Sequence, residues 1–291
     1  RKAGLPAVVS VQGGDGHWVG TCCDTHRTLV RAVFAHAPGL LIGSPSFAAE
    51  VAERHGVDPA RFTVVPGATD VTRFTPSHEL ARLSDPPVLL YHGRVDVRKG
   101  VLDLLAAVRL LLAAGTRVRL LVSGIGPDIA RVRERITELG LDEAVDVLGA
   151  VPYERAPEVY QRGEVFVSPT YAEGFSNTIL EAMATGLPVV STDVVGVRDC
   201  VRPDDNGVLV ASADPPALAA GIRRILTDDA LRRRVAQRAY RDVHSRWSWS
   251  VVAGQITAVY DKLLVETPDV PVIPDPPVDL SCRFRAAPHL L

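Results

Sequence analysis

Residues 165–192 read VFVSPTYAEGFSNTILEAMATGLPVVST, and this stretch decides the fold. The apolar run at 165–167 is typical of a strand buried in a parallel sheet. A helical pattern of apolar positions follows, and Gly186 and Pro188 end it before a second apolar run begins. The stretch therefore predicts strand, loop, helix, turn and strand, which is the repeating unit of a parallel α/β sheet.

The start of the predicted helix is a candidate anion site. The first amides of a helix lack backbone partners and carry partial positive charge, so a diphosphate fits there. Gly174 has no side chain to block close approach of the backbone. Ser176 or Asn177 is expected to cap the helix by accepting from its first amides. Glu173 and Glu181 place a carboxylate on either side of this helix start.

Seven residues separate the two glutamates, and this spacing resembles the E-x7-E signature of the retaining GT-B glycosyltransferases, in particular glycosyltransferase family 4. The resemblance extends through Gly174-Phe175 and through the string EAMATGLPVV at residues 181–190. It implies an α/β fold of GT-B type, with two Rossmann-like parallel-sheet domains. The alternative that the residues allow is a helix start with solvated acidic side chains.

The string HGRVDVRKG at residues 92–100 follows a predicted strand at 88–91. In the family that the chain resembles, an Arg and a Lys of this string clamp the diphosphate of the donor, and Arg94 and Lys99 match them. The chemistry agrees, because a leaving diphosphate gains negative charge as its bond to the sugar breaks. An exposed basic loop is the alternative interpretation.

The resemblance also implies a role for each carboxylate. Glu173 is the expected catalytic residue, facing the sugar ring and opposing the positive charge that develops at the anomeric carbon. Glu181 is expected to hold the ribose hydroxyls. Gly124 lies in a turn where backbone can approach a nucleotide, and Val151 lies in the loop expected to meet the base. The full predicted donor-binding set is Arg94, Lys99, Gly174, Phe175, Ser176, Asn177, Thr178, Glu181, Gly124 and Val151.

Two residues near the amino terminus are candidate sugar contacts. At the end of the strand predicted at 7–11, the family usually carries a His near the transferring sugar, whereas this chain has Gln12. Glutamine can hydrogen-bond a hydroxyl but cannot ionise. His17 is the second candidate, with a surface or structural histidine as the alternative.

The chain is predicted to have two α/β domains, the first of them incomplete. Repeated strand and helix patterns before residue 65 predict a parallel sheet. Because a full first domain of the family has an opening strand and glycine-rich turn before this region, we expect an amino-terminally truncated fragment. The predicted parts are a partial acceptor-side domain at 1–75, a linker at 76–87, a nucleotide-sugar-binding domain at 88–246, a crossing helix at 247–265 and a proline-rich tail at 266–291.

Composition narrows the possible partners. The 291 residues are 47% hydrophobic and carry a net charge of −2, which describes a globular protein and gives no reason to expect nucleic-acid binding. No apolar run is long enough to predict a membrane-spanning helix. Cys22 and Cys23 are adjacent while Cys200 and Cys282 stand alone, and this spacing suggests neither a zinc site nor a disulfide framework. Reduced thiols in a cytosolic protein are expected, with a redox role for the adjacent pair as the alternative.

The predicted activity is transfer of a sugar, of hexosyl type, from a nucleotide-diphosphate donor to an acceptor hydroxyl with retention of configuration. The acceptor is a sugar, a lipid-linked or a small molecule. No cofactor and no metal are expected, because the cations and helix amides neutralise the leaving group and the donor segments hold no Asp-x-Asp string. Residues 173–177 and 193–196 resemble enzymes of cell-surface polysaccharide, glycolipid or glycoconjugate biosynthesis. A cytoplasmic location is predicted, and peripheral contact with the inner face of the membrane is compatible with it.

The sequence leaves three other functions to consider. A truncated chain can bind a nucleotide sugar without transferring it. A glycosidase needs two carboxylates about 5–10 Å apart across one bond, whereas eight helical positions span about 12 Å. A dinucleotide oxidoreductase shares the fold class, but the chain lacks a Gly-x-Gly-x-x-Gly turn after a first strand.

Overall fold

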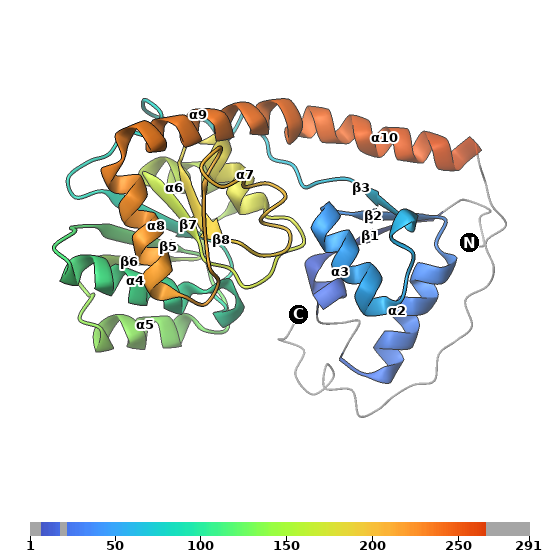
Figure 1. Ribbon diagram of the computed structural model, residues 1–291, viewed down its shortest axis with the longest axis horizontal. Coiled ribbons are helices and arrows are strands. Elements are labelled where there is room, and N and C mark those ends of the chain that lie inside the picture. Colours follow the sequence, from blue (N-terminus) through green and yellow to red (C-terminus); the bar gives the residue numbers. More distant parts are fainter. Residues whose placement is uncertain (1–6, 18–21, 266–291) are drawn as a thin grey trace. The chain divides into compact units, whose positions relative to one another are not determined.

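The computed structural model describes residues 7–17 and 22–265, which divide into two compact units (Figure 1). Unit 1 consists of the described parts of Arg1–Gly67 and Ser250–Leu291, together with Glu173–Phe175. Unit 2 consists of Ala68–Ala172 and Ser176–Trp249. The first unit thus ends before the predicted boundary at residue 75, and the predicted tail at 266–291 lies outside the described residues.

Unit 2 is built on a six-stranded parallel sheet with the strand order β6-β5-β4-β7-β8-β9. The strands are β4 (Val88–His92), β5 (Arg119–Ser123), β6 (Val145–Gly149), β7 (Val165–Ser168), β8 (Val189–Thr192) and β9 (Val208–Val210). Chain order runs in opposite directions on the two sides of β4. The carboxyl ends of β4 and β7 are therefore the topological switch point, where open α/β sheets bind ligands.

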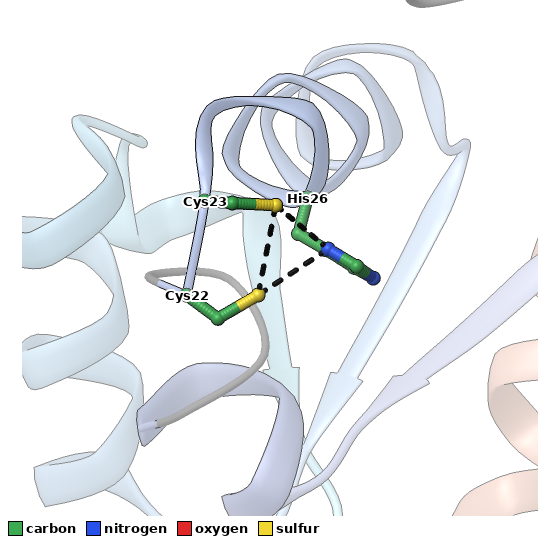
Figure 2. A group of neighbouring side chains, drawn as sticks. All are labelled: Cys22, Cys23 and His26. Atoms are coloured by element: carbon green, nitrogen blue, oxygen red, sulfur yellow. Dashed lines mark hydrogen bonds between the residues drawn. The ribbon is translucent and has the colours of Figure 1, made fainter. Parts of the chain in front are cut away.

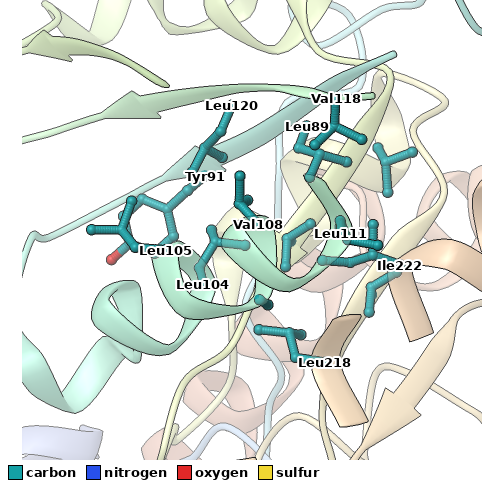
Figure 3. Packing of buried hydrophobic residues seen from close by; sticks show 14 of the residues in the cluster. Leu89, Tyr91, Leu104, Leu105, Val108, Leu111, Val118, Leu120, Leu218 and Ile222 are labelled. Atoms are coloured by element: carbon teal, nitrogen blue, oxygen red, sulfur yellow. The ribbon is translucent and has the colours of Figure 1, made fainter. Parts of the chain in front are cut away.

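One face of this sheet is covered by α4 (Val101–Ala113), α5 (Ile129–Glu138) and α8 (Pro215–Thr227). Figure 3 shows the contact between strand and helix side chains, with Leu89 and Tyr91 of β4 facing the apolar stripe of α4. The labelled α4 residues Leu104, Leu105, Val108 and Leu111 are all buried. Burial of one such leucine side chain stabilises the fold by about 2 kcal/mol.

The other face is covered by α6 (Ala156–Arg162) and α7 (Asn177–Ala184). Tyr160 of α6 stacks on Phe166 of β7 with ring centroids 5.6 Å apart. Phe74 meets the same tyrosine edge-on at 5.4 Å and is completely buried. This contact ties residues 68–75, which the sequence pattern assigned to the first domain, to unit 2.

The remaining elements of unit 2 are the 3-10 helices η3 (Val97–Lys99) and η4 (Tyr153–Arg155) and the long helix α9 (Asp229–Arg246). Helix α10 (Trp249–Val265) follows, and apart from Trp249 it is counted with unit 1. Within the described ranges, every helix falls short of the length and apolar character that crossing a bilayer requires.

Unit 1 has a three-stranded parallel sheet of β1 (Val8–Val11), β2 (Gly39–Ile42) and β3 (Phe62–Val64), in that order. Its other elements are α1 (Gly13–His17), α2 (Asp24–His36), α3 (Pro45–His55) and η2 (Pro59–Arg61). Helix α3 begins where the sequence predicts, because Ser44 accepts from the Phe47 amide at 3.2 Å and Pro45 stands at the first helical position.

Helix α1 is a short element that the sequence analysis did not predict. Its glycines disfavour helix in isolation, but tertiary packing overrides that preference. A Cβ on Gly16 would lie 2.7 Å from the Phe47 ring of α3, so only glycine lets the two helices approach this closely.

Candidate functional site

In unit 2, backbone hydrogen bonds hold the loops that follow β4 and β5 to their neighbours. The Gly93 amide donates to the carbonyl of Ser123, the last residue of β5, at 3.0 Å, and the Gly124 amide donates to the carbonyl of Gly149, the last residue of β6, at 2.8 Å. The Val95 amide donates to the Ile125 carbonyl at 2.9 Å, so the loops after β4 and β5 are also joined directly at the carboxyl edge of the sheet.

Gly124, predicted to let backbone approach a nucleotide, already has a packing reason to be glycine. Its φ is +125°, and a Cβ there would lie 1.8 Å from the Gly93 carbonyl oxygen. The loop after β6 holds the half-buried Val151, which borders a cavity of about 320 Å³ with Pro152 and Arg155.

The loop after β4 is organised by Asp96, a buried carboxylate. Asp96 accepts from Arg98 Nε at 2.8 Å and from the Arg98 amide at 3.0 Å, which begins η3. Arg94 Nε lies 3.4 Å from the same carboxylate. The Arg98 hydrogen bond is the main reason that the pKa of Asp96 is lowered to about 2. Two of the loop's cations are thus held by one ionised group, and half-buried Lys99 donates its amide to the Asp96 carbonyl at 2.8 Å.

The loop after β7 packs directly on η3. The Tyr171 amide donates to the Arg98 carbonyl at 2.9 Å. Gly100 has a φ of +70°, and a Cβ there would lie 1.9 Å from the Pro169 carbonyl oxygen. The Tyr171 hydroxyl donates to Asp103 Oδ2 at 2.8 Å. Burial is the main cause, and this hydrogen bond the second cause, of the rise in the pKa of Tyr171 to about 12. The loops on the two sides of the switch point are therefore in contact.

The start of α7 differs from the prediction in one respect. Ser176 stands at the N-cap with φ −97° and ψ 100°, but its side chain makes no capping hydrogen bond within the described chain. Its buried Oγ instead lies 3.2 Å from Thr178 Oγ1. The predicted cap is therefore wrong for Ser176, and Asn177 is the first helical residue. The Ser176 side chain leaves the first amides of α7 available for another acceptor.

Glu181 is held by a residue that the sequence reasoning missed. The Tyr160 hydroxyl donates to Glu181 Oε2 at 2.7 Å and lies 3.2 Å from the Thr178 carbonyl. Burial raises the pKa of Glu181, while the Tyr160 hydrogen bond and the nearby Arg73 charge partly oppose that rise. The same burial and the adjacent carboxylate raise the pKa of Tyr160 well above its usual value.

The Tyr160 ring also contacts the end of β4. Its centroid lies 5.1 Å from the ring of His92, whose Nδ1 is 2.9 Å from Ser123 Oγ. Burial lowers the pKa of His92, which favours a neutral imidazole. Tyr160 therefore connects β4, β7 and α7 at the switch point.

Two further residues were also missed as supports of the site. Asp96 lies between Arg94 and Arg98 in the basic string at residues 92–100, and this position next to two arginines could have identified it. Arg73 lies far from Glu181 in sequence, and its guanidinium sits 4.6 Å over the Tyr153 ring and donates to the Tyr153 carbonyl at 3.1 Å.

Glu173–Phe175 is counted with unit 1, where its backbone meets polar side chains. Ser44 Oγ donates to the Gly174 carbonyl at 3.0 Å. His17 is buried, with Nε2 3.4 Å from the Glu173 carbonyl and Nδ1 3.0 Å from Glu50 Oε1. The structure therefore brings together His17 and the backbone of the predicted catalytic glutamate.

Gln12, the other predicted sugar contact, is exposed at the end of β1. Its side-chain Nε2 donates to Ser10 Oγ at 2.7 Å, and its backbone carbonyl accepts from the Gly16 amide at 3.1 Å. The backbone bond begins α1, and neither contact points to a ligand.

A cavity of about 430 Å³ in unit 2 lies at the opposite edge of the sheet. Val88, Arg119 and Glu164 border it, and each stands at or just before the amino end of a strand. It is therefore separate from the loops described above, which all follow the carboxyl ends of strands.

Comparison with known proteins agrees with this architecture. A D-inositol 3-phosphate glycosyltransferase of Geodermatophilus obscurus is 35% identical over 243 residues, which are 78% of this chain and 53% of that protein. The sucrose-phosphate synthase of Thermosynechococcus elongatus superposes with a TM-score of 0.74 and 30% identity, covering 87% of this chain and 65% of that one. Anabaena HepE, solved in complex with UDP, has the same fold, with a TM-score of 0.76, 19% identity, and coverage of 89% and 72%.

The chain spans roughly half to three-fifths of the curated relatives it matches, with 53% and 60% for two of them. The family model described as "Glycosyl transferases group 1" matches residues 75–242, which include the six-stranded sheet, the Arg94 loop and α7. The structural neighbours establish the fold as GT-B. The chain therefore belongs to the group 1 glycosyltransferases.

Proposed function

We propose that unit 2 binds the nucleotide-diphosphate part of a sugar donor, and that the chain carries the donor half of a retaining glycosyltransferase. One observation carries the proposal. At the β4/β7 switch point, the loop after β4 carries Arg94 and Lys99 and is hydrogen-bonded to the loop after β7, and the uncapped α7 carries the half-buried Glu181.

The diphosphate would bind Arg94, Lys99 and the first amides of α7. Each of these is a donor to phosphate oxygen, and together they offset the charge that grows on the leaving group. Asp96 orients the loop by holding the Arg94 and Arg98 guanidinium groups. Glu181, held by the Tyr160 hydroxyl, would accept hydrogen bonds from the two ribose hydroxyls.

The sugar transfer itself is assigned to Glu173 and the donor. The bond between the anomeric carbon and the phosphate oxygen breaks, and the oxygen leaves with the electron pair. The same oxygen then takes the proton of the acceptor hydroxyl, whose oxygen bonds to the anomeric carbon on the face just vacated. Configuration is retained, and Glu173 opposes the transient positive charge on the sugar.

The relatives support the donor class more than the acceptor. HepE has been solved with UDP and with UDP-glucose, and other relatives are named for an inositol phosphate and for a kanosaminyl group. A uridine diphosphate hexose and a polyol or sugar hydroxyl are accordingly the first donor and acceptor to test. A role in glycolipid or cell-surface glycan synthesis, at the cytoplasmic face of a membrane, remains part of the proposal.

The deciding experiment is calorimetric titration of the chain with UDP, GDP and ADP. One nucleotide is expected to bind, and Glu181→Ala is expected to weaken it at least tenfold, or about 1.4 kcal/mol. Glu138→Ala is the matched control, since Glu138 is an exposed carboxylate on α5 that pairs with Arg135. Equal affinities for the wild type and both variants would overturn the assignment of Glu181.

Binding and transfer are separated in a second assay. The chain is incubated with the nucleotide sugar that binds and with an inositol phosphate or simple sugar acceptor, and the product is analysed by NMR. An α-linked product from an α-linked donor supports a retaining transferase. Tight donor binding without product from any acceptor supports a nucleotide-sugar-binding function of this chain.

A further inference from the structure

The structure brings together two thiols and an imidazole that the sequence spacing did not suggest as a metal site. Cys22 Sγ and Cys23 Sγ are 3.8 Å apart, and His26 Nδ1 lies 3.3 Å from the first and 3.1 Å from the second (Figure 2). All three residues are half-buried in unit 1.

The backbone explains how such a short segment can form this cluster. Cys23 is the N-cap of α2, with an extended conformation at φ −160° and ψ 169°. The Arg27 amide donates to the Cys23 carbonyl at 3.0 Å and closes the first helical turn. That turn places His26 over the cap, and in Figure 2 both sulfurs point toward its ring.

The distances match the edges of a tetrahedral zinc site. Zinc binds thiolate at about 2.3 Å and imidazole at about 2.0–2.1 Å, so two thiolates are about 3.8 Å apart and sulfur and nitrogen about 3.5 Å apart. The sulfur–sulfur distance agrees at 3.8 Å. The sulfur–nitrogen distances of 3.3 and 3.1 Å need only a shift of the His26 ring by a few tenths of an ångström.

The neighbouring Asp24 carboxylate is 89% exposed and lies 3.2 Å from Arg27 of the same helix, so its charge is directed to solvent and balanced. A disulfide between the cysteines would require sulfurs about 2.0 Å apart, whereas the two sulfurs lie 3.8 Å apart.

We propose that Cys22, Cys23 and His26 form a three-ligand site for Zn²⁺, with the fourth position filled by water. Thiolate and imidazole donors select zinc over the hard cations magnesium and calcium. The site belongs to unit 1 and is independent of the nucleotide-binding loops of unit 2. Its test therefore needs no glycosyltransferase activity.

The test uses the full chain, reduced, freed of metal with a chelator and titrated with Co²⁺ as an optical probe, followed by Zn²⁺. One equivalent of Co²⁺ is expected to give thiolate-to-cobalt charge-transfer absorption, which one equivalent of Zn²⁺ removes. Cys22→Ser, Cys23→Ser and His26→Asn are each expected to weaken zinc binding at least tenfold. Circular dichroism of the metal-free variants, expected to equal the wild type, separates ligand loss from misfolding.

Cys282→Ser is the matched thiol control, because it removes a cysteine outside the described residues and leaves the three ligands in place. Its zinc affinity is expected to equal that of the wild type. The proposal fails if the chain gives no charge-transfer band, or if Cys282→Ser weakens binding as much as Cys22→Ser. It also fails if mass spectrometry finds the adjacent thiols joined as a disulfide while zinc remains in excess.

Discussion

Units 1 and 2 are both parallel sheets joined by helices, yet they differ in how far their strands are buried. Every residue of the central strands β7 and β8 of unit 2 is buried, whereas β2, the central strand of unit 1, buries three residues of four. The loops of unit 2 are also joined to one another by backbone hydrogen bonds. A parallel sheet that is covered on both faces can hold its loops rigidly. The proposed diphosphate contacts of Arg94, Lys99 and the first amides of α7 are therefore expected to depend on the packing of unit 2.

The largest expected difference between the units comes from one added methyl group. Gly124→Ala in unit 2 places a Cβ 1.8 Å from the Gly93 carbonyl oxygen at a φ of +125°. It should destabilise the fold by about 3–5 kcal/mol. Gly14→Ala in α1 of unit 1 meets nothing within 4 Å and should be neutral or stabilising by about 0.5–1 kcal/mol. Urea unfolding measures both, and similar losses would contradict the comparison.

The second prediction compares two arginines of similar exposure. Arg94 of unit 2 has a side chain 41% exposed beside Asp96, and Arg54 of unit 1 has one 38% exposed beside Glu50. Arg94→Gln should lower the affinity for the nucleoside diphosphate about 10- to 100-fold, because a hydrogen bond to a charged group contributes about 1.5–3 kcal/mol. Arg54→Gln should leave it unchanged in the same calorimetric titration. An equal loss in both variants would mean that unit 2 does not bind the diphosphate by itself.

The third prediction concerns the acid stability of unit 2. The pKa of Asp96 is lowered to about 2 in the folded chain, so its ionised form stabilises the fold above the ordinary pKa of a carboxyl group. This contribution is lost as the pH falls from about 4 toward 2. Asp96→Asn should therefore lower the free energy of unfolding by about 1–2 kcal/mol at pH 7, after allowance for solvent screening. The difference from the wild type should shrink at pH 3, as urea unfolding at the two pH values would measure.

The smallest expected effect comes from Tyr160→Phe, which removes the donor to Glu181. It should cost about 1 kcal/mol of stability. Because the lost hydrogen bond lowers the pKa of Glu181, that pKa should rise further above its usual value. Ionised Glu181 then costs more stability, and this cost appears as the pH rises through the pKa of the folded state.

If nucleotide binding needs ionised Glu181, its affinity should decline at a higher pH in Tyr160→Phe than in the wild type as the solution is acidified. Calorimetric titrations between pH 5 and 8 measure this midpoint. Tyr153→Phe is the control, since Tyr153 is 55% exposed. A midpoint that stays the same in Tyr160→Phe would rule out the positioning role of Tyr160.

The sequence predicted the elements of unit 2 well because each has a local cause. Apolar runs such as 165–167 became fully buried strands, and Gly186 ended α7 with a φ of +80°. The prediction of a glycosyltransferase with the GT-B fold is confirmed by the family model and by the solved structures. The roles of Glu173, Arg94 and Lys99 stay predictions until ligands are measured.

The parts that could not be predicted depend on residues far apart in the chain. Tyr160 holds Glu181 only because α6 and α7 pack together on one face of the sheet. Helix α1 forms because Gly16 packs against Phe47. The helix propensities of the residues of α1 do not predict this tertiary contact. The cluster of Cys22, Cys23 and His26 depends on the extended conformation of Cys23 at the N-cap of α2. The spacing of the cysteines in the sequence does not predict this conformation.

The strand order of unit 2 has a consequence for synthesis of the chain on the ribosome. β4, β5 and β6 leave the ribosome first and can pair in chain order, while the other edge of β4 waits for residues 165–168. Until then the nascent half-sheet presents an apolar, unpaired edge, which is prone to aggregation. The seam that closes when β7 arrives is also the switch point that carries the candidate site. A nascent chain stopped before residue 165 therefore contains Arg94 and Lys99 but lacks β7 and α7, which complete the candidate site.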